Sequence, residues 1–270
     1  MRRICLLLIL AMLLSGCALG LPVQTTQPAT VAPSTTATVQ PTETTAPPVT
    51  IPATTAPVVT EPLHSPLYIP GLSVEDVILY FNEVCLDAEF VNGGDPGVLQ
   101  KWDAPIFYML HGDYTPEDLT VLEGFLDWLN TVEGFPGFVP AEAPHLSDLN
   151  IYFCTEQELL DRLGDNFYGT DGGVTFWYDG NNVIYDAIIC YRTDLDQTLR
   201  NSVILEEIYN CLGPVQDTDL REDSIIYAGY SMPQSLTAID ELIFRLLYHP
   251  LMECGMTAAE CEAVIRQLYY

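Results

Sequence analysis

The stretch from Gly173 to Gly213, GVTFWYDGNNVIYDAIICYRTDLDQTLRNSVILEEIYNCLG, contains the local signals that decide the fold class. Its first part has two strand-like runs, 173–178 and 183–191, rich in β-branched and aromatic residues. They are joined by the tetrapeptide DGNN, which is typical of a hairpin turn. A helix is predicted over 198–212, and Gly213 followed by Pro214 marks its end. A hairpin that leads into a long helix predicts a mixed sheet packed on helices.

Capping boxes mark the starts of five more helices. In each box a Ser or Thr at the N-cap is followed three residues later by a carboxylate that can bond back to it. The pairs are Ser73 with Asp76, Thr115 with Asp118, Thr155 with Glu158, Thr237 with Asp240, and Thr257 with Glu260. The predicted order is helix 74–90, strand 105–110, helix 116–131, strand 149–154, helix 156–163, strands 173–178 and 183–191, and helices 198–212, 237–248 and 258–269. We therefore expect one α+β domain over residues 67–270, with a small mixed sheet, one antiparallel edge strand and a helical C-terminal part.

The first residues, MRRICLLLILAMLLSGCALG, have the pattern of an export signal. Two arginines precede an apolar run that is shorter than the roughly 20 residues needed to span a bilayer. The ending Leu14-Ser15-Gly16-Cys17 resembles the lipobox of bacterial lipoproteins, in which cleavage before the cysteine leaves a diacylated N-terminus. The resemblance implies a signal peptide over 1–16 and a lipid on Cys17. The alternative is an ordinary secretory signal with an unrelated cysteine.

Residues 17–66 are predicted to be a linker, because they consist mainly of Thr, Pro, Ala and Val. Proline at this density favours extended polyproline II and prevents a packed core. At about 3.1 Å per residue, roughly 40 such residues reach over about 100 Å. A tether of this length suits a Gram-positive cell. We therefore expect a lipid-anchored domain on the extracellular face of the plasma membrane.

The composition is strongly acidic, with a formal net charge of −28 and a single lysine, Lys101. Such a surface repels phosphate backbones and anionic lipids, so we expect no nucleic-acid binding. It favours basic ligands or metal cations, although a charged surface also serves simply to keep an exported domain soluble. We expect the domain to be a monomer.

Six cysteines belong to the predicted domain: Cys85, Cys154, Cys190, Cys211, Cys254 and Cys261. An even number in an exported domain permits up to three disulfides, and buried thiols are an equal alternative. None of these cysteines has CxxC spacing or the neighbouring histidine of a zinc finger. The spacing therefore gives no sign of a structural zinc site.

The candidate functional site lies in the helix predicted over 198–212. Glu206 and Asn210 are four residues apart and share a helix face. The stretch EEIYNCLG resembles the HExxHxLG helix of zincin metallopeptidases of the metzincin branch, with Glu206 and Asn210 in the positions of the zinc-binding histidines. By this resemblance Glu207 takes the position of the catalytic general base, and Gln216 and Asp217 fall where a third ligand comes.

The side chains at these positions are poor zinc ligands. Catalytic zinc takes three strong ligands, most often imidazoles. None of the four histidines, His64, His111, His145 and His249, lies in the helix or in the expected third position. Carboxylate and amide oxygens suit hard cations such as calcium instead. We therefore expect no zinc, and either another divalent metal at Glu206, Asn210, Gln216 and Asp217 or no metal.

Over residues 73–270 the chain looks like the bacterial family called domain of unknown function 2927 (DUF2927). The stretches that carry this resemblance are EEIYNCLG, the earlier KWDAPI over 101–106, and GMT over 255–257. The resemblance implies a zincin-like fold and brings no known activity. We expect a degenerate zincin-like domain that binds a peptide, protein or cell-wall component without catalysis. The alternatives are a divergent metallohydrolase with Glu207 as general base, and a structural head without a ligand.

Overall fold

The structure is a computed structural model that describes residues 65–86, 97–229 and 231–270. The chain divides into two units, Met1–Val58 and Val59–Tyr270, and every described residue belongs to the second. The predicted signal peptide, the lipidated Cys17 and nearly all of the linker therefore lie outside the described residues. Within the described ranges, no helix has both the length and the apolar character needed to cross a membrane.

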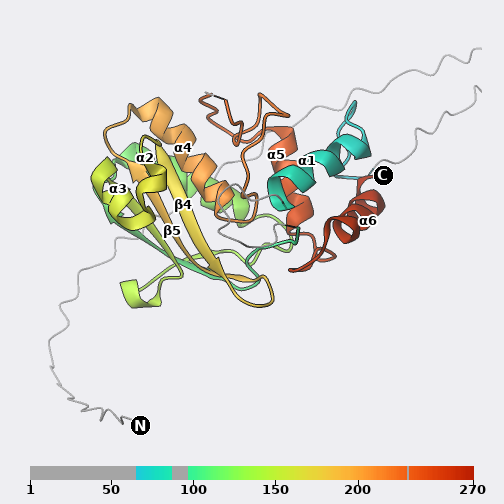
Figure 1. The fold of residues 1–270 in the computed structure, drawn as a ribbon, viewed down its shortest axis with the longest axis horizontal. Coiled ribbons are helices and arrows are strands. Elements are labelled where there is room, and N and C mark those ends of the chain that lie inside the picture. The colour runs from blue at the N-terminus through green and yellow to red at the C-terminus, as the bar shows by residue number, and fades with distance from the viewer. Residues whose placement is uncertain (1–64, 87–96, 230) are drawn as a thin grey trace, which may run out of the picture. The chain divides into compact units, whose positions relative to one another are not determined.

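A mostly parallel five-stranded sheet is the centre of the domain (Figure 1). Its strands are β1 (Ile106–Gly112), β2 (Phe138–Pro140), β3 (Leu149–Cys154), β4 (Gly172–Tyr178) and β5 (Ile184–Arg192). They lie in the order β2-β1-β3-β5-β4, and only β4 runs antiparallel to its neighbour. The predicted mixed sheet with one antiparallel edge strand is thus confirmed. The short strand β2 was not predicted.

The described part of the chain has six α-helices. They are α1 (Val74–Leu86), α2 (Pro116–Leu129), α3 (Glu156–Leu163), α4 (Gln197–Asn210), α5 (Ala238–Leu247) and α6 (Ala258–Tyr269), with short 3-10 turns η1 (Pro144–Leu146) and η2 (Asp165–Phe167). Of these helices, α1, α5 and α6 group together beside the sheet (Figure 1). All five predicted capping boxes are confirmed by reciprocal hydrogen bonds. The helix predicted from 198 begins one residue earlier, because Asp196 caps it by accepting from the N–H groups of Thr198 and Leu199.

The two faces of the sheet are covered by different helices. Side chains such as Ile151 and Ile189 point into the main core, whose other members include residues of α2 and α4. Cys154 comes three residues after Ile151, and Cys190 comes one residue after Ile189. Because both offsets are odd, these two side chains point to the opposite face, where they pack with Leu159 of α3. This alternation follows from the two-residue period of a strand. It places α4 and α3 on opposite sides of β5.

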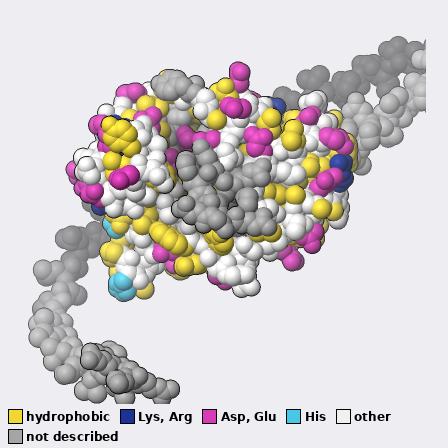
Figure 2. Space-filling model, in the orientation of Figure 1, with side chains coloured by type: hydrophobic (Ala, Val, Ile, Leu, Met, Phe, Trp, Pro, Cys, Tyr) yellow, Lys and Arg dark blue, Asp and Glu magenta, His cyan; other side chains and the backbone are white. Residues whose placement is uncertain are grey.

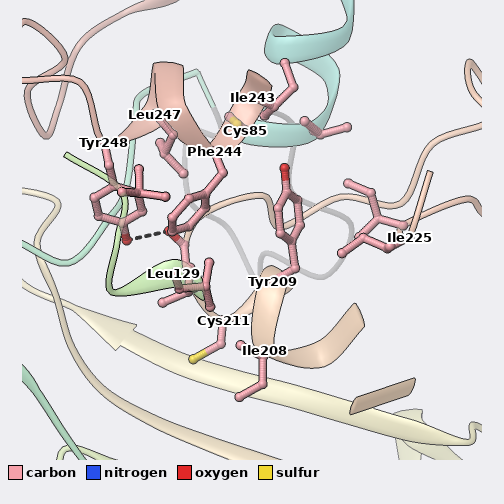
Figure 3. Packing of buried hydrophobic residues seen from close by; sticks show 14 of the residues in the cluster. Cys85, Leu129, Ile208, Tyr209, Cys211, Ile225, Ile243, Phe244, Leu247 and Tyr248 are labelled. Carbon is pink, nitrogen blue, oxygen red and sulfur yellow. Dashed lines mark hydrogen bonds between the residues drawn. The ribbon is translucent and has the colours of Figure 1, made fainter. Parts of the chain in front are cut away.

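The main core continues from α4 to the C-terminal helices (Figure 3). Tyr209, Phe244 and Tyr248 are fully buried, with ring centroids 6.1 Å apart for the first pair and 4.8 Å for the second. The two tyrosine hydroxyls donate to the backbone carbonyls of Asp240 and Leu212, each at 2.8 Å. Each buried phenol therefore has an acceptor, so its burial leaves no unpaired hydroxyl.

The segment before β1 ties the sheet to the C-terminal helices. Lys101 is only 8% exposed, and its Nζ donates to the carbonyls of Leu247 (3.0 Å) and Met252 (2.6 Å). The indole of Trp102 donates to the carbonyl of Cys211 at 3.0 Å. Burial lowers the pKa of Lys101. The Lys101 ammonium group lies at the end of α5, where it satisfies a carbonyl that the helix leaves unpaired. Lys101 and the adjacent Trp102 therefore have a structural role.

Candidate functional site

α4 places Glu206 and Glu207 beside the start of the edge strand β4. Glu207 is 8% exposed, and its carboxyl lies against Gly172, the first residue of β4. A Cβ at Gly172 would lie 3.0 Å from Oε1 of Glu207 and 2.5 Å from Cγ1 of Val203. The absence of a side chain at Gly172 therefore lets α4 and the Glu207 carboxyl approach the strand.

Both glutamates are in an environment that disfavours their charged forms. Burial, followed by the negative charges of Asp217 and Asp171, raises the pKa of Glu206 to about 8. The pKa of Glu207 is well above its ordinary value because of burial and the charges of Glu206 and Asp217. Both carboxyls therefore bind a proton more readily than an exposed glutamate does.

The other predicted ligands are arranged less favourably. Oδ1 of Asn210 is buried and accepts no hydrogen bond from the described residues. The side-chain amide of Gln216 donates to the backbone carbonyl of Asp217 at 3.1 Å, and its backbone N–H donates to Val84 of α1. The structure thus brings Asp217 near Glu206, while Gln216 is occupied with backbone contacts.

The described side chains do not fit a zinc ion at this site. No group of three or more His, Cys, Asp or Glu side chains in the described ranges is placed to hold a metal. His111 lies on β1, where it contacts Asn150 at 2.9 Å and stacks on Tyr152. His249 follows α5 and accepts from the N–H of Leu251. Neither imidazole contributes to the surroundings of Glu206 and Glu207.

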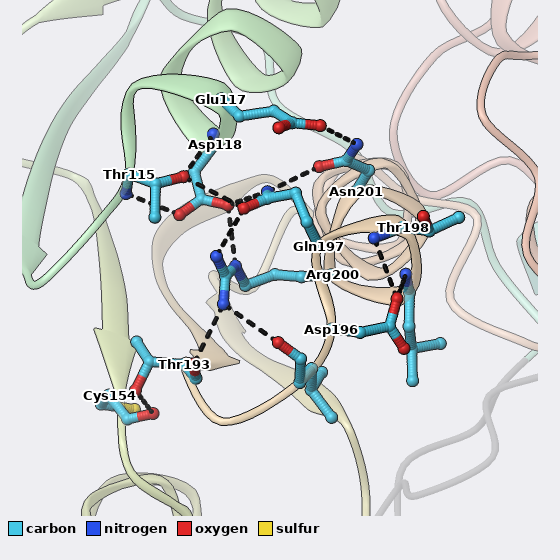
Figure 4. Close-up of polar contacts among 12 residues, drawn as sticks. Thr115, Glu117, Asp118, Cys154, Thr193, Asp196, Gln197, Thr198, Arg200 and Asn201 are labelled. Atoms are coloured by element: carbon cyan, nitrogen blue, oxygen red, sulfur yellow. Dashed lines mark hydrogen bonds and ion pairs between the residues drawn. The ribbon is translucent and has the colours of Figure 1, made fainter.

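A buried polar cluster holds the first turn of α4 against α2 (Figure 4). Nε of Arg200 lies 2.8 Å from Oδ1 of Asp118, and the two side chains are 7% and 0% exposed. Gln197 donates to the same carboxylate at 2.6 Å, and the N–H of Thr115 donates at 2.7 Å. Burial alone would raise the pKa of Asp118, but these hydrogen bonds hold it below its ordinary value. The cluster fixes where the following turns of α4, and so the glutamates, meet the sheet.

The outer side of β4 has no neighbouring strand in the described part of the sheet. Near its end, Trp177 and Tyr178 are 41% and 38% exposed. Figure 2 shows many carboxylates and few basic side chains on the face it draws. On this side β4 therefore has no strand partner among the described residues, and it lies in an acidic molecule.

A family model described as "Protein of unknown function (DUF2927)" matches residues 75–267. The chain belongs to the DUF2927 family. The match runs from α1 into α6 and so includes the whole sheet and the site on α4. No curated protein matches the chain. The family resemblance inferred from the sequence is thus confirmed.

In this DUF2927 domain, Asp171 and Gly172 are the site residues that the sequence did not reveal. The structure has a turn at 168–169, and β4 begins at Gly172 shortly after it. That turn also places Asp171 near Glu206 and Gly172 against Glu207. No local signal predicts this proximity, because it depends on which strand becomes the neighbour of α4.

Two hollows on the surface of the DUF2927 domain lie away from these glutamates. One, of about 210 Å³, is lined by Leu72, Arg221 and Ile239 among others. The second, of about 310 Å³, lies at the β2 edge and is lined by apolar side chains that include Phe107 and Leu146. Neither contains a residue of α4, so neither is part of the candidate site.

Proposed function

We propose that this DUF2927 domain is a degenerate zincin-like module that binds an extended peptide or protein segment along the open edge of β4, without zinc-dependent catalysis. The observation that carries the proposal is the pair of the partly buried Glu206 and the buried Glu207 beside this edge, where the resemblance to zincins implies a histidine and a general base. A zincin edge strand lines the substrate cleft. An open edge offers unpaired N–H and C=O groups to an added strand.

The chemistry of the site favours a basic ligand. Glu206, Glu207, Asp171 and Asp217 supply carboxyl groups, and Asn210 supplies a buried amide oxygen with no donor among the described residues. No cation is among the groups that set the pKa of either glutamate. Lysine and arginine side chains carry donors and no acceptors, so they complement a site of this kind.

The state of Glu207 supports binding over hydrolysis. A general base must be ionised and have a pKa near the working pH. Burial and the charges of Glu206 and Asp217 raise the pKa of Glu207 and so disfavour its anion, and no hydrogen bond from the described residues is among the causes that set this pKa. The rival proposal, a divergent metallohydrolase that uses Glu207, needs a ligand to reverse this state.

The binding proposal is tested by selecting a displayed library of random heptapeptides on the purified full-length chain. We expect peptides to be enriched, and their affinity to fall at least about tenfold, equivalent to about 1.4 kcal/mol, in Trp177→Ser and Glu206→Gln. Tyr270→Ser is the matched control, because Tyr270 is an exposed aromatic residue (65%) outside β4. Failure to enrich any peptide, or equal affinity in all variants, would contradict the proposal.

Metal analysis and a general peptidase assay separate the two functions. We expect no stoichiometric zinc and no peptide hydrolysis by the wild-type chain. Stoichiometric zinc together with an activity that Glu207→Gln abolishes would establish the metallohydrolase instead.

The proposed location on the outer face of the plasma membrane rests on the lipobox-like ending at Cys17 and the Thr/Pro-rich linker. Cys17→Ala should move the protein from the membrane fraction to the soluble fraction and abolish labelling by a radioactive fatty acid. Cys5→Ala, inside the predicted signal peptide, should change neither. Unchanged labelling of Cys17→Ala would show that the lipid is elsewhere or absent.

A further inference from the structure

Two cysteines lie side by side on neighbouring strands, on the sheet face opposite α4. Cys154 is the last residue of β3, and Cys190 of β5 has Tyr152 as its register partner, two residues before Cys154. Both side chains pack with Leu159 of α3 and are 5% and 0% exposed. Both are free thiols in the structure, and each shifts the pKa of the other, which indicates that the two sulfur atoms are close.

The surroundings make the two thiols unequal. Contact with the Cys190 thiol lowers the pKa of Cys154, burial opposes this, and the Arg162 guanidinium lowers it further. Cys154 also directly precedes Thr155, the N-cap of α3, and the positive end of a helix favours a nearby thiolate. The pKa of Cys190 is raised by the same contact and by burial. Thiolate character is therefore concentrated on Cys154, while Cys190 keeps its proton.

The other described cysteines lack such an environment. Burial raises the pKa of Cys85, Cys211, Cys254 and Cys261. A buried thiol of this kind is inert toward oxidants, since the thiolate is the nucleophile. The paired thiols on β3 and β5 are thus chemically distinct from the rest.

We propose that Cys154 and Cys190 form a reversible oxidation site, at which a hydroperoxide converts the two thiols into a disulfide that links β3 to β5. The Cys154 thiolate attacks one peroxide oxygen, the O–O bond breaks, and the departing hydroxide takes a proton to become water. The resulting Cys154 sulfenic acid is then attacked by the Cys190 sulfur. The S–O bond breaks, and its oxygen leaves as water with the Cys190 proton. The two thiols lose two electrons, and one hydrogen peroxide becomes two waters.

The geometry sets two conditions on this reaction. The thiols are buried, so the oxidant must be as small as hydrogen peroxide. Parallel strands lie about 4.8 Å apart and rise about 3.3 Å per residue, so a two-residue offset puts the Cα atoms about 8 Å apart, beyond the usual disulfide limit of about 6.8 Å. Closure therefore needs a shift of about 1 Å. Cys154 ends its strand, so this shift falls on the strand terminus and on α3, which begins two residues later.

Peptide mapping tests the proposal on the wild-type chain. The purified full-length protein is treated with hydrogen peroxide under native conditions, its remaining thiols are alkylated, and it is digested with trypsin without reduction. Cleavage after Lys101, Arg162 and Arg192 puts the two cysteines on separate peptides, 102–162 and 163–192, each with a single cysteine. We expect these peptides to appear linked, and to separate after treatment with dithiothreitol.

Two variants identify the order of events. Cys190→Ser should prevent the link and leave a sulfenic acid on Cys154 that dimedone labels. Cys254→Ser should leave the link unchanged, because Cys254 is a half-buried thiol outside the pair. The proposal is wrong if the oxidised wild-type protein contains no linked pair, or if other cysteines oxidise while Cys154 and Cys190 both stay alkylatable after unfolding. The wild-type map gives this answer even if a variant fails to fold.

Discussion

Replacing Arg200 by Met should remove a large part of the free energy of unfolding. The substitution keeps an unbranched apolar stem but deletes the guanidinium, which contacts Asp118 at 2.8 Å, Gln197 Oε1 at 2.7 Å and the carbonyl of Thr193 at 3.0 Å. Asp118 is 0% exposed and would stay buried without its cation. Breaking a buried ion pair on one side costs about 3–5 kcal/mol, because the remaining charge cannot return to water.

Urea unfolding followed by tryptophan fluorescence measures this loss. We expect a lower midpoint with an unchanged dependence of the free energy on urea concentration. Arg266→Met is the matched control, because Arg266 also contacts two carboxylates, Glu75 at 2.8 Å and Glu262 at 2.9 Å, but is 43% exposed. An exposed pair contributes about 0–1 kcal/mol. If the two substitutions cost the same, the buried cluster does not stabilise the α2–α4 contact as argued.

The same pair has a defined pH dependence. The pKa of Asp118 is lower in the folded state than its ordinary value of 3.8. Its stabilising contribution is therefore present above pH 3.8 and is lost as the pH falls through the lower, folded-state value. The difference in the free energy of unfolding between wild type and Arg200→Met should become smaller as the pH falls below 3.8, and it should stay constant near neutral pH. A difference that instead widens on acidification would contradict the assigned direction.

Three further outcomes follow from single positions. The pKa of Glu206 is raised from 4.5 to about 8, so between these pH values the folded state holds an extra proton. The protein therefore loses stability as the pH rises from 4.5 to about 8. Glu206→Gln should reduce this fall in the urea midpoint measured across the same pH interval. Gly172→Ala should cost about 1–3 kcal/mol by calorimetry, because its Cβ would overlap Val203, whereas Gly180→Ala, with no atom within 4 Å, should change little. Lys101→Met should lower the free energy of unfolding by about 2–4 kcal/mol, measured with urea, since it leaves two buried carbonyls without a donor. A change below about 0.5 kcal/mol would mean that water replaces the lysine ammonium group.

The elements of this fold that the sequence predicted are those specified by neighbouring residues. A capping box needs only residues three apart, so Thr155 and Glu158 locate the start of α3 correctly. The hairpin between β4 and β5 depends on four adjacent residues, and Asn182 has the positive φ of 63° that such a turn requires. By contrast, β2 is three residues long and ends in Pro140, so it has too few alternating positions to give a strand signal.

Part of the candidate site could not be predicted, because it depends on contacts between distant segments. The helix periodicity predicts that Glu206 and Asn210 share one face, and in the structure Asp217 lies near Glu206. The periodicity could not show that the Gln216 amide is occupied by a backbone carbonyl, or that Asp171 comes from a turn before β4. Burial, which decides the protonation of both glutamates, is a property of the packed domain rather than of the helix.

The position of Lys101 has a consequence for how the domain forms. Its two carbonyl partners lie 146 and 151 residues later in the chain, and the partner of Trp102 lies 109 residues later. Pairings across such separations form slowly, because the intervening chain must be ordered before the contact is gained. Until residue 252 has been synthesised, the ammonium group lacks one of its two carbonyl partners, although the backbone carbonyl of Lys101 can already accept from the N–H of Ile184. The contacts of the only lysine are therefore complete only after α5 and the turn that follows it are present.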